Sequence, residues 1–96
     1  MSEVTVLVLP PRFDFQHHVA FTANYENFFV NDAANTLQLN FSQVTYLDTS
    51  ALGMLMLLAK KHRALGASGG LEIIGALGSC REMLEIANMS NYFDIK

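Results

Sequence analysis

The unbroken apolar run from Ala51 to Ala59 is the feature that most restricts how this 96-residue chain can fold. It is far shorter than the roughly 20 residues that a membrane-spanning helix needs, so we expect it to lie in a buried helix of a soluble domain. The residues just before it, 48–50, are an acid and two hydroxyls. They favour a helix start because a side-chain oxygen can accept a bond from an amide of the first turn. With Gly66 suited to the helix end, the sequence predicts a helix from about Ser50 to Leu65.

This predicted helix is apolar on two sides. Helical spacing turns one stripe toward a sheet, made of Leu52, Leu55, Met56 and Ala59. The other side then carries Met54, Leu57 and Leu58. A second apolar side is either covered by another layer of the protein or offered to a partner, and 96 residues leave little material for another layer. The pattern therefore leaves open a docking surface on this helix.

Strand-like and helical segments alternate along the rest of the chain. Strands are predicted at 4–9, 36–41 and 71–74, with a short strand at 12–15 and an edge strand or docked tail at 92–95. A helix is predicted at 19–31, where the apolar face consists of Phe21, Tyr25, Phe28 and Phe29. Another is predicted to begin with an S-x-x-E capping box, Ser79 to Glu82. The alternation predicts one α/β domain over residues 1–96, a mixed sheet of four to five strands with helices packed against it.

Charge and cysteine content exclude several classes of protein. The net charge is −3 with only six Lys and Arg, so we expect no nucleic-acid binding through phosphate contacts. Cys80 is the only cysteine, which excludes an internal disulfide and a thiolate metal cluster within one chain. The chain opens on Met-Ser-Glu rather than on a basic segment. We expect a cytoplasmic protein without membrane insertion.

The sequence lacks the residue patterns that are typical of enzyme active sites and metal sites. Asp48, Ser50 and a histidine suggest a hydrolase triad, but the G-x-S-x-G elbow is absent and no base lies near the serine in sequence. The three histidines show no metal-ligand spacing. The glycine pairs lack the Lys-Ser/Thr of a phosphate-binding loop. We therefore expect no enzyme activity, no metal and no cofactor.

The segment Asp48-Thr49-Ser50 has two physical interpretations. It is an ordinary helix cap, or it is a hydroxyl at the positive end of a helix dipole that carries a phosphate. The amides of the first turn would partly compensate the charge of that phosphate. Spacing alone favours the cap.

The run Val44-Thr45-Tyr46-Leu47-Asp48-Thr49-Ser50-Ala51-Leu52-Gly53, placed after a predicted strand and opening an apolar helix, resembles the signature of STAS domains of the bacterial anti-sigma factor antagonist type. The order of predicted elements agrees with that family over nearly the whole chain. The family signature is typically Asp, two hydroxyl residues and Gly-Leu-Gly. This chain keeps Asp48 and Gly53 but has Thr49 at the first hydroxyl position and Ala51 where glycine is usual.

The resemblance implies a phosphoprotein of signal transduction and transcription regulation, not an enzyme. Unphosphorylated members bind an anti-sigma factor that is also a serine kinase of the GHKL type, which frees a sigma factor. Phosphorylation of the signature hydroxyl weakens this binding, and a PP2C-type phosphatase restores it. Ser50 matches the usual phosphoacceptor position, with Thr49 as runner-up, in a loop that also contains Asp48, Ala51 and Gly53.

On this hypothesis the docking surface consists of Met54, Leu57 and Leu58, with Lys61 beyond them. The competing hypothesis is a constitutive STAS subunit or scaffold, similar to the small STAS partners of bacterial lipid-transport ABC complexes or of another signalling assembly. Such a subunit would use the same helix to bind an ATPase without phosphorylation. The adjacent hydroxyls after Asp48 favour the phosphorylation switch.

Overall fold

Strands and helices alternate along the chain in the computed structural model, which describes residues 3–96. The strands are β1 (Val4–Val8), β2 (Arg12–Phe13), β3 (Thr36–Asn40), β4 (Tyr46–Leu47), β5 (Leu71–Ile74) and β6 (Asp94–Ile95). The α-helices are α1 (His18–Asn31), α2 (Thr49–Ala64) and α3 (Gly78–Ile86). Two short 3-10 helices, η1 (Phe15–His17) and η2 (Met89–Asn91), precede α1 and β6. The predicted segments are present with ends shifted by no more than two residues, and β4 was not predicted.

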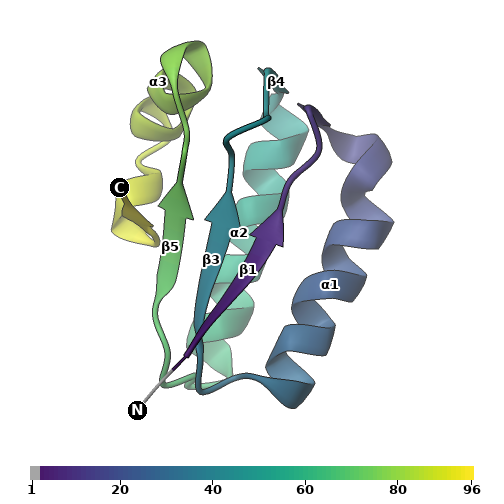
Figure 1. The fold of residues 1–96 in the computed structure, drawn as a ribbon, viewed down its shortest axis with the longest axis vertical. Coiled ribbons are helices and arrows are strands. Elements are labelled where there is room, and N and C mark those ends of the chain that lie inside the picture. The colour runs from purple at the N-terminus through teal and green to yellow at the C-terminus, as the bar shows by residue number, and fades with distance from the viewer. Residues whose placement is uncertain (1–2) are drawn as a thin grey trace.

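The main sheet has four strands in the order β1-β3-β5-β6, and each neighbouring pair is parallel. Parallel neighbours need long crossover connections, which α1, α2 and α3 provide. Figure 1 shows β1, β3 and β5 side by side with α2 behind them. The α/β class is confirmed, but the sheet is not mixed in the described part of the chain. The strand predicted at 12–15 does not join this sheet, because β2 pairs with β4 instead.

One face of the sheet forms the core. The strand register aligns the core-facing residues of β3 and β5, which are Leu37, Leu39, Leu71 and Ile73. Side chains alternate between faces along a strand, so the other face carries partly exposed residues such as Gln38 and Glu72, joined by a hydrogen bond of 2.9 Å. All four predicted aromatic residues of α1 are buried, and successive rings meet edge to face. The helices thus cover one face of the sheet.

Helix α2 is rotated relative to the phase predicted from the sequence. Its buried residues are Ala51, Met54, Leu55, Leu58 and Ala59, while Leu52 and Met56 are only half-buried. Leu58 is 0% exposed and Met54 is 7% exposed, so the prediction that both lie on an open side was wrong. The polar residues decide the phase, because Ser50, Gly53 and Lys60 share the exposed side and Leu57 lies among them.

The sequence predicts the end of α2 correctly but not the capping of the start of α3. The predicted capping box of α3 is absent, because the helix begins at Gly78 and its N-cap, Leu77, makes no side-chain cap bond. The end of α2 agrees with the prediction. Gly66 has a φ of 62°, which glycine tolerates better than other residues, and its amide donates to the carbonyl of Arg63 at 3.1 Å. Within residues 3–96, no helix has the length and apolar character required to cross a membrane.

Candidate functional site

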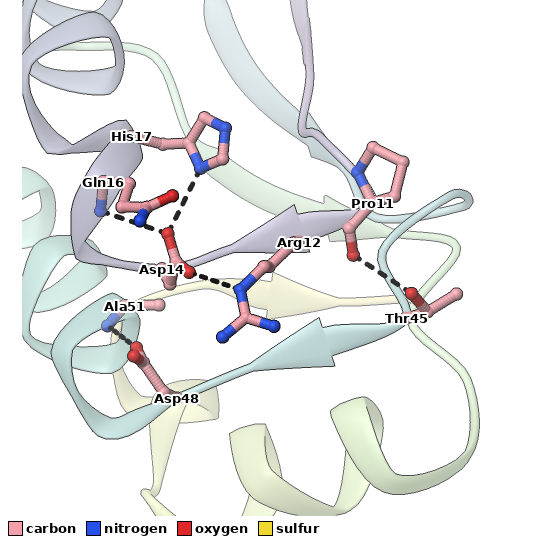
Figure 2. Close-up of polar contacts among 8 residues, drawn as sticks. All are labelled: Pro11, Arg12, Asp14, Gln16, His17, Thr45, Asp48 and Ala51. Carbon is pink, nitrogen blue, oxygen red and sulfur yellow. Dashed lines mark hydrogen bonds and ion pairs between the residues drawn. The ribbon is translucent and has the colours of Figure 1, made fainter.

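The short β2–β4 pair brings two aspartates to the same edge of the molecule. Its parallel register sets Arg12 beside Tyr46 and Phe13 beside Leu47. The next residue on each strand is an aspartate, Asp14 on one and Asp48 on the other, and each begins a helical segment (Figure 2). The two helix starts are therefore fixed side by side.

Asp48 is the N-cap of α2. Its backbone is extended, and its Oδ1 accepts a hydrogen bond from the amide of Ala51 at 2.8 Å (Figure 2). The carbonyl of Asp48 accepts from the amide of Leu52 at 3.2 Å. The capping role expected from the sequence is confirmed. Thr49 and Ser50 follow in the first turn, and both side chains are exposed.

Asp14 makes the corresponding cap for η1 in a more charged setting. It is only 6% exposed, and its Oδ1 accepts from the amide of Gln16 at 3.1 Å. The Nε of Arg12 donates to Oδ2 of Asp14 at 2.7 Å, and Nδ1 of His17 lies 3.4 Å from Oδ1 (Figure 2). The hydrogen bond from Arg12 is the main cause that lowers the pKa of Asp14. The same bond raises the pKa of Arg12.

Arg12 also joins the two short strands. Its guanidinium lies over the ring of Tyr46, 4.1 Å from the ring centre, while its Nε holds Asp14. At the opposite end of the two strands from the aspartates, the hydroxyl of Thr45 donates to the carbonyl of Pro11 at 3.2 Å (Figure 2). These contacts compensate for the few ladder hydrogen bonds that two-residue strands can make.

A groove of about 500 Å³ opens beside the capped start of α2. One wall belongs to α2, which contributes Ser50, Gly53, Met54, Met56, Leu57 and Lys60. The other wall is Phe15 of η1 and His18 of α1, whose rings stack 4.5 Å apart. The side chains of Phe15 and Leu57 are each 60% exposed. Two large apolar side chains that are both this exposed in one groove are typical of an interaction site. The site is thus an exposed hydroxyl at the end of an open apolar groove.

Comparison with known proteins identifies the family. Residues 1–94 match the family model described as Mlab, STAS domain. The chain belongs to the STAS domain family. A STAS-domain containing protein of Pseudomonas aeruginosa (strain UCBPP-PA14) is 34% identical over 94 residues, which cover 98% of this chain and 88% of the relative. The family resemblance found in the sequence is thereby confirmed.

Solved structures of bacterial anti-sigma factor antagonists share the fold of this STAS domain. A Thermotoga maritima protein assigned as an anti-sigma factor antagonist gives a TM-score of 0.79 at 18% identity, covering 96% of this chain and 77% of that chain. The unphosphorylated form of the anti-sigma factor antagonist SpoIIAA gives 0.77 at 14% identity, covering 100% and 82%. The phosphorylated form of the Bacillus cell fate determinant SpoIIAA gives 0.71 at 16% identity, covering 100% and 85%. At these identities the likeness concerns the fold.

The structure separates the predicted site residues of this STAS domain into two groups. Ser50, Gly53, Met54 and Leu57 line the groove, with Met54 as a largely buried part of its wall. Leu58 is in the core and Ala51 is buried behind the cap, so neither contributes exposed surface. Lys61 does not line the groove, and its Nζ pairs with Glu26 of α1 at 3.3 Å. Thr49 is exposed but is not part of the groove wall.

Sequence reasoning missed four residues of the groove, which are Phe15, His18, Met56 and Lys60. Phe15 and His18 lie more than 30 positions before α2, so they reach it only through tertiary contacts, the pairing of β2 with β4 and the packing of η1 and α1 on α2. The position of Lys60 was predictable from the sequence, because it follows Ser50, Gly53 and Leu57 at helical spacing. Throughout 3–96, no three His, Cys, Asp or Glu side chains are arranged to hold a metal ion.

Proposed function

We propose that this STAS domain is a phosphorylation-switched regulatory binding protein of the anti-sigma factor antagonist type. In its unphosphorylated form it binds an anti-sigma factor that is also a GHKL-type serine kinase, and phosphorylation of Ser50 releases that partner. One observation carries the proposal: Ser50 is exposed in the first turn of α2 and lines the same groove as the exposed Leu57 and Phe15.

The position of Ser50 suits a modification that changes binding without unfolding α2. A phosphate near a helix N-terminus interacts favourably with the helix dipole and with first-turn amides. It adds about two negative charges at the groove, where desolvation opposes contact with an apolar partner. Asp48 keeps its cap to Ala51 and adds like charge close to the phosphate. The fold would therefore stay intact while the docking surface is blocked.

The groove favours Ser50 over Thr49 as the phosphoacceptor. Both hydroxyls are exposed, but only Ser50 is in the groove wall. A kinase that docks on this groove would reach Ser50 first, and a phosphate on Thr49 would lie outside the contact. A PP2C-type phosphatase would reset the switch. SpoIIAA, a structural neighbour, has itself been solved in both phosphorylated and unphosphorylated forms.

The test is the affinity of the protein for a serine kinase encoded beside its gene, measured by calorimetry with four variants. Ser50→Ala should bind as tightly as the unmodified protein and resist release by ATP. Ser50→Asp should bind at least about tenfold more weakly, a loss that corresponds to roughly 1.4 kcal/mol. Thr49→Ala and Thr49→Asp are the matched controls and should behave like the unmodified protein. Equal affinity of Ser50→Asp and Ser50→Ala would contradict the switch.

A second candidate is a constitutive subunit or scaffold of a lipid-transport ABC complex or another signalling assembly. The family model that matches the chain is described as Mlab, STAS domain, and not as an antagonist, which supports this candidate. It would use the same groove without phosphorylation. Transport genes beside this gene, together with tight binding of Ser50→Ala and Ser50→Asp alike to the neighbouring ATPase, would favour it.

A further inference from the structure

Gly53 occupies an interior position of α2 that the fold does not require to be glycine. Its backbone is not in the left-handed region, and a Cβ added there would meet no atom within 4 Å. Glycine destabilises a helix interior relative to alanine because it loses more backbone entropy on folding. The position is exposed and lines the groove. The described residues therefore give no packing reason for a glycine at this position, whereas a surface that packs against the groove would give one.

The groove is lined by basic residues and by no acidic ones. Its lining includes Lys60 and His18 but no Asp or Glu. The side chain of Lys61 is paired with Glu26 across the α1–α2 contact, whereas the ammonium group of Lys60 makes no hydrogen bond or ion pair to a described residue. The groove thus offers an exposed cation beside apolar side chains.

These features follow one line along α2. Ser50, Gly53, Leu57 and Lys60 recur at helical spacing, so the line extends about 15 Å from the hydroxyl to the cation. A straight apolar wall with a glycine in it suits a second helix, since amphipathic helices bind by laying an apolar face into such grooves. Without a Cβ at Gly53, the backbone of the second helix can approach α2 closely.

We infer that the groove accepts an amphipathic, acidic helix of the partner, which crosses α2 at Gly53. This inference rests on the proposed function and names its partner segment. The apolar face of that helix packs on Leu57 and Phe15, and an acidic side chain pairs with Lys60. A phosphate on Ser50 would then face an acidic segment, and repulsion would add to the blocked contact.

The probes are two amphipathic helical peptides of equal length with the same leucine stripe, one flanked by glutamates and the other by lysines. Binding to the isotope-labelled full chain is followed by NMR. The acidic peptide should shift the amide signals of Phe15, Gly53, Leu57 and Lys60, and added salt should weaken it. Equal shifts from both peptides, shifts outside the groove or no shifts from the acidic peptide would overturn the inference.

Three variants make the test specific. Gly53→Ala should unfold at a temperature a few degrees higher than the unmodified protein, since the helix gains stability, yet bind the acidic peptide about tenfold more weakly. Lys60→Gln should weaken the acidic peptide about two- to fivefold, the range of one exposed ion pair. Lys61→Gln removes the same charge outside the groove and should leave the affinity unchanged. A Gly53→Ala protein that binds normally, or equal effects of the two lysine variants, contradicts the inference.

The result of the peptide test can be distinguished from the result of the phosphorylation test of Ser50. Phosphorylation of Ser50 by the kinase does not depend on the peptides, so a phosphorylated Ser50 with no preference for the acidic peptide would remove this inference alone. Preference for the acidic peptide in a protein that no kinase modifies would remove the switch and retain the docking mode.

Discussion

At the scale of single residues, two aspartates hold the site together. Asp48 and Asp14 follow paired strands and cap adjacent helical segments, which fixes α2 relative to η1. Phe15, one residue after Asp14, and Ser50, two residues after Asp48, both line the groove. The caps therefore set the geometry of the groove, and they do not need to take part in chemistry.

Removal of the Asp48 cap tests this role. Asp48→Ala should lower the free energy of unfolding by about 1 kcal/mol, because the amide of Ala51 loses its partner. Asp48→Asn keeps an acceptor and should stay within a few tenths of a kcal/mol of the unmodified protein. Urea unfolding followed by circular dichroism measures both. A loss as large in Asp48→Asn as in Asp48→Ala would show that charge, and not the cap bond, is what stabilises the helix start.

Asp14 gives the structure a defined acid sensitivity. The hydrogen bond from Arg12 lowers the pKa of Asp14 in the folded protein. Its contribution to stability is therefore complete above the ordinary pKa of an aspartate and is lost as the pH falls through the lower folded value. An NMR titration should place the midpoint of Asp14 below that of an exposed aspartate, and Arg12→Gln should raise it. An unshifted midpoint in both proteins would contradict the ion pair.

The carboxyl of Glu72 affects stability over the same acid range. Its pKa is also lowered, chiefly by the hydrogen bond from Gln38. Acid unfolding of the unmodified protein therefore combines both carboxylates. Asp14→Asn serves as the control, and it should reduce the loss of stability below the ordinary pKa of an aspartate without abolishing it.

At the scale of elements, the rotation of α2 decides which leucine is core and which is surface. Two helical stripes one residue apart are both apolar, so the apolar residues alone do not decide between them, and the side that carries Ser50 and Lys60 does. The structure buries the stripe that contains Leu58 and leaves Leu57 among the polar residues. Adjacent leucines thus have different roles.

This pair of leucines provides a direct test of the helix phase. Leu58→Ala should lower the free energy of unfolding by about 2–5 kcal/mol, since it empties a fully buried position. Leu57→Ala should change it by no more than about 0.5 kcal/mol and should weaken partner binding. Comparable destabilisation by both changes would mean that the helix is rotated differently.

The sequence predicted most of the elements but little of the site's second wall. Strands β1, β3 and β5 are apolar or alternating runs of four or five residues, helices α1 and α2 have apolar residues at helical spacing, and the ends of all five were predicted to within one residue. Strands β2 and β4 have two residues each, which is too short for a periodic signal. Their pairing is a tertiary event, and it brings Phe15 and His18 to α2. The cap by Asp48 was predictable because first-turn chemistry is local. The choice of Ser50 as phosphoacceptor came from the family resemblance and stays a prediction.

At the scale of the whole molecule, this chain shares its fold with solved structures of low sequence identity. Solved antagonists keep the same architecture at 14–18% identity, so most surface residues are free to differ. Function must then be argued from the site and not from the fold. Here the site is a hydroxyl, a glycine, exposed apolar side chains and a lysine on one side of α2.

The most direct test of the central claim is to locate the phosphate. The protein is incubated with the serine kinase encoded beside its gene and with ATP, and peptides that cover residues 48–56 are analysed by mass spectrometry. We predict one phosphate on Ser50, its absence in Ser50→Ala and its retention in Thr49→Ala. A phosphate on Thr49 alone, or an unmodified protein bound to an active kinase, would contradict the account.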